Sequence, residues 1–107
     1  MSELIRIPFR SCFRDLLLSG EKTCTARTGR MGEPGDVFEA FDAKFELLSV
    51  QQVYLHEVAS RWKEEGCMSR EHFIEVWKSI HPRAGYRPYQ LVQLHTFRRI
   101  NDDIHHR

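Results

Sequence analysis

Residues 20–27 read Gly-Glu-Lys-Thr-Cys-Thr-Ala-Arg and bring together an amine, hydroxyl groups and a guanidinium. If this segment is an extended strand, Thr23, Thr25 and Arg27 share one face, and the small residues between them point to the other. A phosphate-binding P-loop is excluded, because it needs glycine before the lysine and a strand before a helix. We therefore expect a polar strand face that is available to a ligand. The alternative is a solvated strand that is rich in threonine because threonine favours strands.

The elements around this strand follow from capping and turn residues. Ser11 as an N-cap and Gly20 as a stop predict a helix over 11–20. If Lys22 still lies in the turn after that helix, its side chain can meet Thr25, which would otherwise lie on the opposite strand face. Alternating or β-rich segments predict strands over 4–7, 23–28, 37–41, 45–54 and 89–97, with a tight connection at 42–43. The last of these strands is apolar on both faces, which is typical of a central strand.

Two helices are expected between the fourth and the last of these strands. One spans about 56–65 and ends at Gly66, and the other begins at Ser69 and ends before 81–82. Apolar residues of the second helix recur at helical spacing, so we expect its tryptophan to pack in a core. No alternating strand–helix repeat is present, which disfavours a doubly wound parallel sheet. The order favours an α+β fold, a small and partly closed β-barrel of about five or six strands with helices packed on it.

Length and composition set further bounds. The 107 residues, with a mass of 12.7 kDa, predict a single domain over 1–107, with a frayed polar tail over 98–107. No apolar run could span a membrane, and the first residues lack the pattern of a secretory signal. Three cysteines without a CxxC pair favour a reducing, cytoplasmic setting. We expect no cofactor and no structural metal, only adventitious binding at His105 and His106.

The net charge of +1 conceals a pattern along the chain. Basic and acidic side chains number six and three in residues 1–30, five and ten in 31–80, and five and two in 81–107. Bulk electrostatic binding to nucleic acid or membrane is disfavoured by the total. The two basic ends could nevertheless form one local surface if the fold brings them together.

The sequence resembles the ASCH domain of the PUA-like superfamily. Residues 20–27 match its G-x-K-T-x-T-x-R signature, and a Gly-Asp pair at 35–36, an E-E-G element at 64–66 and the closing strand follow in order. The resemblance implies a PUA-like β-barrel with a cleft beside the signature strand. It also implies a ligand that is a nucleoside, a nucleotide or single-stranded RNA.

Some small ASCH proteins are amidohydrolases that deacetylate N4-acetylcytidine with a Lys, a Thr and a Glu. Here the resemblance places the first two at Lys22 and Thr25, and the acid at Glu65, with Glu64 as the next choice, because a plain register aligns Gly66 with the family's glutamate. Either Thr25 attacks the amide, activated by a neutral Lys22, or Glu65 activates a water while a charged Lys22 stabilises the oxyanion. Both routes stay open at this point.

Other functions compete with hydrolysis of an N-acylated cytidine. Some ASCH proteins are ribonucleases, and others are presumed to be RNA-binding modules without catalysis. Basic residues would contact phosphates, and an aromatic residue would stack on a base, unless Tyr86 only packs its loop onto the barrel. The ligand-binding candidates are Thr23, Arg27, Arg30, Arg83, Tyr86 and Arg87, with Arg6 and Arg10 on the same basic surface. A third alternative is a protein-interaction adaptor.

Overall fold

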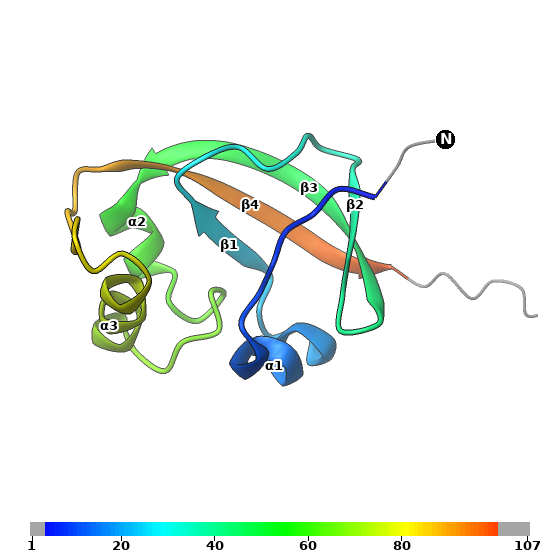
Figure 1. Cartoon of the computed structure of the whole chain (residues 1–107), viewed down its shortest axis with the longest axis horizontal. Coiled ribbons are helices and arrows are strands. Elements are labelled where there is room, and N and C mark those ends of the chain that lie inside the picture. Colours follow the sequence, from blue (N-terminus) through cyan, green and yellow to red (C-terminus); the bar gives the residue numbers. More distant parts are fainter. Residues whose placement is uncertain (1–3, 101–107) are drawn as a thin grey trace, which may run out of the picture.

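A curled antiparallel sheet forms the framework of the molecule, as Figure 1 shows. The computed structural model describes residues 4–100. Within them, four strands lie in the order β1-β4-β3-β2. Their bounds are Cys24–Arg27 for β1, Val37–Ala40 for β2, Ala43–Tyr54 for β3 and Leu91–Ile100 for β4. The predicted α+β half-open barrel is thus confirmed, with β4 in the interior of the sheet between β1 and β3.

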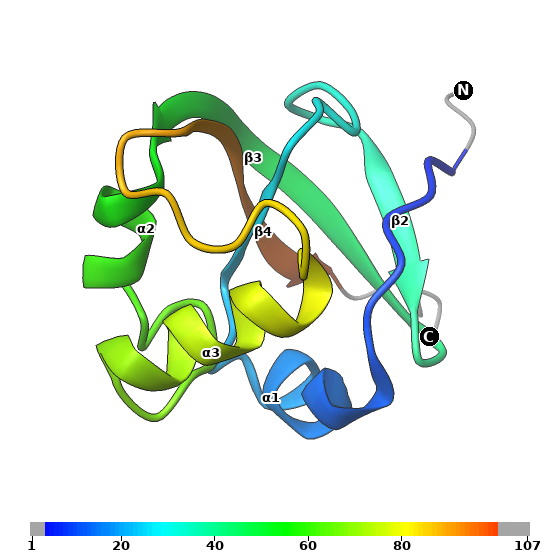
Figure 2. The same cartoon turned by 60° about the vertical axis from the view of Figure 1, so that its left-hand side comes forward.

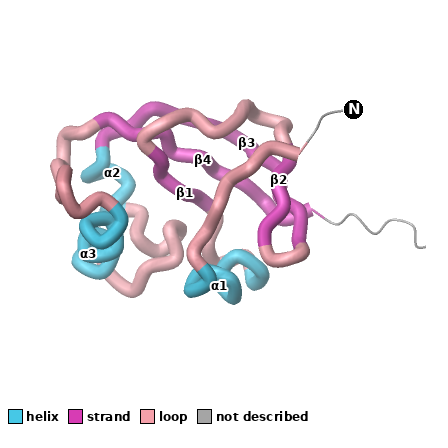
Figure 3. Tube along the Cα trace, viewed as in Figure 1, coloured by secondary structure: helices cyan, strands magenta, loops and turns pink. Residues whose placement is uncertain are grey.

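Helices pack against this sheet (Figures 2 and 3). A 3-10 turn, η1 (Ser11–Phe13), leads into α1 (Arg14–Ser19), and α2 (Leu55–Ser60) and α3 (Arg70–Ile80) follow β3. Gly20 ends α1 in the left-handed conformation, and the Ser69 hydroxyl accepts a hydrogen bond from the His72 amide at 3.0 Å, as expected for an N-cap. No helix between residues 4 and 100 is long and apolar enough to cross a membrane.

Several predicted boundaries are wrong. Residues 4–7 form only an isolated parallel bridge between Ile5 and Phe38, so the described sheet has four strands rather than five or six. Ser11 lies inside the 3-10 turn and caps no helix with its side chain. The β2–β3 turn is made by Phe41 and Asp42, both at positive φ, while Ala43 already pairs in β3.

The predicted frayed tail is wrong in its first part. β4 continues to Ile100, because residues 98–100 pair with Glu46, Phe45 and Lys44 of β3. Arg98 also bonds the Glu46 carboxylate at 2.9 Å. Residues 101–107, including His105 and His106, lie outside the described part of the chain.

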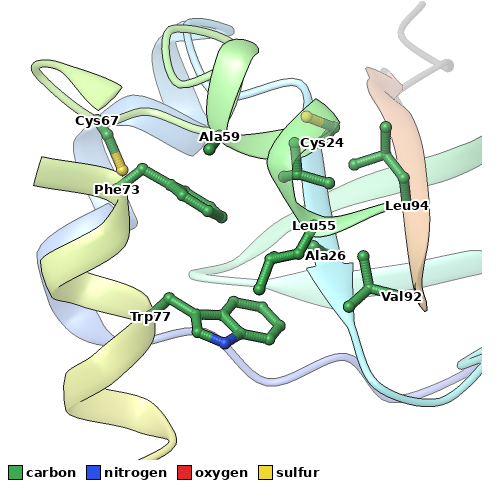
Figure 4. Packing of buried hydrophobic residues seen from close by; sticks show 10 residues of the cluster. Cys24, Ala26, Leu55, Ala59, Cys67, Phe73, Trp77, Val92 and Leu94 are labelled. Atoms are coloured by element: carbon green, nitrogen blue, oxygen red, sulfur yellow. The ribbon is translucent and has the colours of Figure 1, made fainter. Parts of the chain in front are cut away.

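The buried apolar residues separate into two clusters. The first, here called the Phe cluster, lies where residues 5–18 pack against β2 and the adjoining parts of β3 and β4, and its buried members are Ile7, Leu17, Phe38, Ala43, Phe45, Leu47 and Phe97. The second, here called the Trp cluster, lies between α2, α3 and the sheet, as Figure 4 shows. Its buried members are Cys24, Ala26, Leu55, Val58, Ala59, Cys67, Phe73, Trp77, Val92 and Leu94.

Candidate active site

A cavity of about 370 Å³ lies on the α3 side of β1. Three stretches of the chain line it: residues 8–13, residues 22–27, which include β1, and residues 65–80, which include α3. Its lining includes the polar side chains of Lys22, Thr25, Arg27 and Glu65. Its walls are largely apolar and include Phe9, Phe13, Phe73, Val76, Trp77 and Ile80. Apolar walls with a few convergent polar groups are typical of small-molecule sites.

Lys22 and Glu65 form a buried ion pair in this cavity. Their residues are only 3% and 5% exposed. The Lys22 ammonium donates to the backbone carbonyl of Glu65 at 2.6 Å and lies 3.3 Å from its carboxylate Oε1. It also lies 4.6 Å from the centroid of the Phe13 ring, a cation–π distance. A buried pair of this kind is costly to desolvate, so its position in a cavity marks it as a functional candidate.

The second oxygen of Glu65 faces Cys24. The Cys24 thiol lies 3.5 Å from Oε2 and donates to it. Burial, together with the Glu65 charge, raises the pKa of this thiol, so Cys24 stays a protonated donor. Burial also raises the pKa of the Glu65 carboxyl, against the opposing effect of the Lys22 ammonium. A carboxylate with a raised pKa is a better proton acceptor near neutral pH than an ordinary one.

Gly66 explains how Glu65 reaches Lys22. Its φ is +86°, and a Cβ there would lie 3.2 Å from a methyl of Leu16 and 3.3 Å from the Lys22 Cβ. Only glycine fits both the conformation and the close approach without strain. The predicted helix over 56–65 is therefore wrong beyond Ser60, since residues 61–66 form turns that bring Glu65 back to Lys22. Glu64 is exposed and accepts the Thr23 amide only through its carbonyl, so Glu65 is the glutamate in the cavity.

Thr25 and Arg27 project from β1 into the same cavity. Thr25 is buried rather than solvated, and its hydroxyl accepts a hydrogen bond from Arg27 Nε at 3.1 Å. Arg27 also donates to the Pro8 carbonyl at 2.7 Å and lies 5.0 Å from the Phe9 ring centroid. These contacts hold the N-terminal segment across β1. Lys22 precedes β1, as needed for its side chain to share a cavity with that of Thr25.

The other predicted ligand-binding residues lie elsewhere. Thr23 lines a separate hollow with Trp62 and Lys63. Arg30 is paired with Glu33, and the exposed Arg83 and Arg87 do not line the cavity. Tyr86 packs against the Trp cluster with its hydroxyl buried. Of the remaining basic candidates, Arg10 lines the cavity and reaches Ser79 of α3 at 3.2 Å, whereas Arg6 lines another hollow beside β2.

Sequence reasoning missed the aromatic walls. Phe73, Val76, Trp77 and Ile80 are the apolar stripe of α3, and all four line the cavity. Their helical spacing was a visible signal, but the same spacing is expected whether a helix faces a core or a cavity. Phe9 and Phe13 carried no motif. Residues 4–100 contain no group of three or more His, Cys, Asp or Glu side chains suited to hold a metal ion.

His95 is a buried titratable residue that belongs to the framework rather than to the cavity. Its Nε2 accepts the Met31 amide at 2.9 Å, which places the ring proton on Nδ1, 3.0 Å from the Gln93 carbonyl. Burial lowers the pKa of His95, so the ring is held neutral. It joins the loop between β1 and β2 to the central strand.

Comparison with known proteins rests on structure. No protein-family model and no curated protein matches this sequence. Among solved structures, an ASCH domain from Lactobacillus crispatus JV V101 superposes with a TM-score of 0.54 at 18% identity, over 79% of this chain and 68% of that one. This chain has an ASCH-like fold.

Two further structures share the ASCH-like fold of this chain. Hypothetical protein PH0355 gives a TM-score of 0.66 at 17% identity, and the match covers 86% of this chain and 94% of that one. Protein EF3133 from Enterococcus faecalis V583 gives 0.55 at 16% identity, over 87% and 72% of the two chains. At these identities the likeness concerns the fold, and it confirms the fold that the resemblance to ASCH domains implied.

Proposed function

We propose that this protein is a small amidohydrolase that removes an acyl group from the exocyclic amine of a cytidine-type nucleoside. The observation that carries the proposal is the buried Lys22–Glu65 pair, which lies with Thr25 in one cavity. Amide hydrolysis needs a base to activate the nucleophile and a donor or cation to stabilise the oxyanion, and a base, a cation and a hydroxyl can fill these roles. The ASCH-like fold and the match of residues 20–27 to the ASCH signature support the same reaction.

The shape and lining of the cavity support a nucleoside as the ligand. Its volume of about 370 Å³ lies within the range of small-molecule sites. The rings of Phe9, Phe13, Phe73 and Trp77 offer apolar surface against which a planar base can pack. The acyl group would then point toward Lys22 and Glu65, where the polar groups are concentrated.

Glu65 is the base in the route that the contacts favour. Its carboxylate accepts a proton from a water molecule, and the resulting hydroxide forms a bond to the acyl carbon. The Lys22 ammonium, already adjacent to Glu65, stabilises the negative charge that develops on the acyl oxygen. Glu65 then passes the proton to the departing nitrogen as the C–N bond breaks, so that the products are the free carboxylic acid and cytidine.

Thr25 has two candidate roles in this reaction. Because its oxygen accepts from Arg27, its own proton is available for donation to the acyl oxygen. In the other role, Thr25 is the nucleophile, and Lys22 would have to accept its proton. Among the described contacts, Lys22 bonds Glu65 rather than Thr25, which favours the first role.

The direct test is turnover of N4-acetylcytidine by the purified protein, followed as release of acetate and cytidine. We expect Lys22→Met and Glu65→Gln to reduce kcat/KM by about 100-fold or more, since each removes a group that acts on developing charge. Lys63→Met and Glu64→Gln are matched controls on exposed neighbours and should keep wild-type rates. Absence of product at micromolar wild-type enzyme would exclude this substrate.

A second comparison separates the two roles of Thr25. If Thr25 only donates a hydrogen bond, Thr25→Val should retain residual turnover, about 10- to 100-fold below wild type. If Thr25 is the nucleophile, Thr25→Val should be as inactive as Lys22→Met, and the wild type should accumulate an acylated enzyme that mass spectrometry detects.

The binding-only alternative is an outcome of the same assays. A nucleoside or single-stranded RNA that binds in the cavity without being cleaved would indicate a non-catalytic module. For RNA, phosphate contacts predict that affinity falls as salt is raised. RNA cleavage that depends on Lys22 and Glu65 would instead indicate a ribonuclease.

A further inference from the structure

The strand that carries the candidate catalytic residues has one free edge. Within the described part of the chain, β1 is the first strand of the sheet and pairs only with β4. The Phe97 amide donates to the Thr23 carbonyl at 3.0 Å, and the same register places Thr25 opposite His95. Bonded and non-bonded pairs alternate along an antiparallel ladder, so Ala26 directs its main-chain N–H and C=O away from β4.

The cavity reaches this free edge. Thr25, Ala26 and Arg27 all line it, although successive side chains of a strand point to opposite faces of the sheet. Its lining also includes Phe9, which packs against the Phe cluster, and Trp77, which belongs to the Trp cluster. A cavity that meets both faces of β1 passes around its free edge, where the main chain of Ala26 lies.

The Ala26 main chain offers a donor and an acceptor side by side. The residue keeps 9% of its surface exposed, and no loop backbone among residues 4–100 bonds its N–H or C=O. Main-chain polar groups on an open strand edge need a partner from solvent or from a ligand. The Ala26 side chain packs with Val92 and Leu94 in the Trp cluster, which holds this main chain in place (Figure 4).

We propose that the Ala26 main chain recognises the base of the substrate: its N–H donates to N3, and its C=O accepts from the N–H of the acylated amine. This inference rests on the proposed function and deepens it. In an N4-acylcytosine, N3 and that N–H lie side by side, whereas an acylated aniline has the N–H but lacks the ring acceptor. Ala26 therefore selects an acylated cytosine, and the acyl group on the same amine points away from the strand into the cavity that holds Lys22 and Glu65.

Amide hydrogen exchange tests the ladder and the contact together. In the free protein the amides of Thr25 and Arg27, which bond β4, should exchange slowly, and that of Ala26 should exchange fast. Saturating N4-acetylcytidine, added to the slow Glu65→Gln variant, should slow exchange at Ala26 by about tenfold or more and move its amide proton signal downfield. If the methyl signals of Thr25 and Val76 respond to the ligand but the Ala26 amide does not, the inference is overturned while the proposed function survives.

Two deletions remove the contact from its two sides. Ala26→Pro removes the N–H, and proline is tolerated on an edge strand where the N–H faces away from the partner strand. The analogue 3-deaza-N4-acetylcytidine carries a C–H in place of N3. Each deletion alone should raise the dissociation constant in the Glu65→Gln background by about tenfold, the effect of one buried hydrogen bond, and the second should add little to the first. A proline that weakens both ligands equally would act by its bulk and would overturn the inference.

Glu39→Pro is the matched control on the other edge strand of the sheet. The Leu47 amide donates to the Asp36 carbonyl at 2.8 Å, so by the same alternation the Glu39 N–H faces away from β3. Glu39 lines the hollow beside β2 and not the cavity. This variant should leave both dissociation constants unchanged in the same background.

The remaining outcomes are also decisive. A 3-deaza analogue that binds as tightly as N4-acetylcytidine would overturn the inference and leave the hydrolysis intact. If wild-type protein neither binds nor cleaves N4-acetylcytidine, the proposed function and this inference fail together. A melting curve shows whether Ala26→Pro is folded, and the analogue and the exchange of the unmutated Ala26 amide give an answer even if it is not.

Discussion

The two clusters on the sheet differ in what they enclose. In the Phe cluster, Phe38 packs against Phe45 and Phe97 with ring centroids 5.2 and 5.4 Å apart, and the buried residues are all apolar. The Trp cluster is bordered by the buried Lys22 and Glu65, and two of its aromatic residues face a cavity. The buried rings of the Phe cluster line none of the hollows described above, whereas Phe73 and Trp77 of the Trp cluster line the cavity.

This difference separates stability from function within one small fold. Close-packed rings gain dispersion and area burial with no unpaired group, so the Phe cluster can be a net source of stability. A cavity forfeits contacts along its walls, and a buried ion pair costs desolvation that its own attraction only partly offsets. The groups proposed for catalysis therefore lie beside the Trp cluster, and the stability that the Phe cluster contributes helps to offset the free-energy cost of the cavity and the buried ion pair.

Matched truncations should give the largest effect. Phe38→Ala removes a fully buried ring from the Phe cluster and should lower the free energy of unfolding by about 3–5 kcal/mol. Phe73→Ala removes a ring that already faces the cavity, so it should cost less, about 2–3 kcal/mol, because fewer contacts are lost. Denaturant unfolding of both variants measures the difference. Equal losses would contradict the distinction between the clusters.

The buried ion pair provides the next test. Lys22→Met leaves Glu65 buried without its cation and should cost about 3 kcal/mol of stability. The double variant Lys22→Met/Glu65→Leu removes both charges and should recover most of that loss, as buried pairs replaced by apolar residues often do. Both variants should hydrolyse N4-acetylcytidine with kcat/KM at least about 100-fold below that of the wild type. A double variant less stable than Lys22→Met alone would mean that the pair is retained for stability rather than for chemistry.

Glycine and serine signals in the sequence correctly predicted two helix ends that depend only on neighbouring residues. Gly20 and Ser69 mark helix ends in the structure because a left-handed stop and a side-chain cap need no distant partner. The Ser11 cap is a local signal that failed. Two larger failures occurred where a distant partner decides the outcome. Residues 61–65 are good helix formers, but they form turns in which Glu65 contacts Lys22, and Arg98 and Arg99 are polar yet pair with β3.

The site shows the same division. The predicted strand placed Thr23, Thr25 and Arg27 on one face. Thr25 and Arg27 share the cavity, whereas Thr23 precedes β1 and lines a separate hollow. The resemblance to ASCH domains suggested Glu65 but could not choose between it and Glu64, because the choice depends on the turn that Gly66 permits. Trp77 could only be assigned to a core, since a helical stripe does not reveal whether its surroundings are filled. The spacing of apolar residues can be read from one segment of the sequence, but the packing around them depends on residues that are distant in the chain.

The protonation of Glu65, which borders the Trp cluster, should make the stability of the protein depend on pH. Because burial raises the pKa of this carboxyl in the folded protein, the folded state binds its proton more tightly than the unfolded chain does. The stability that this proton contributes is complete below the ordinary pKa of about 4.5 and is lost as pH rises through the raised value. Relative to Glu65→Gln, the wild type should lose at most about 1.4 kcal/mol per pH unit in that window.

Urea unfolding of the two proteins between pH 4 and 8 measures this difference, and shared groups such as His95 cancel in it. Glu64→Gln is the matched control, because Glu64 is exposed, and its difference from wild type should stay flat. A wild type that gains stability relative to Glu65→Gln as pH rises would show that the Lys22 ammonium outweighs burial and that the pKa of Glu65 is lowered.

The smallest effect is expected where an ion pair lies at the surface beside the Phe cluster. Arg98 and Glu46 are paired at 2.9 Å, but their side chains are 63% and 29% exposed, so water already solvates the charges. Arg98→Met should therefore lower stability by less than about 1 kcal/mol, and the loss should shrink as salt is raised. The same change of cation to methionine at Lys22 should cost several times more and respond little to salt, because that pair is shielded from solvent. Denaturant unfolding of Arg98→Met and Lys22→Met at low and high salt measures the two losses of stability. Similar losses at both positions would mean that burial does not distinguish the Lys22–Glu65 pair from the Arg98–Glu46 pair.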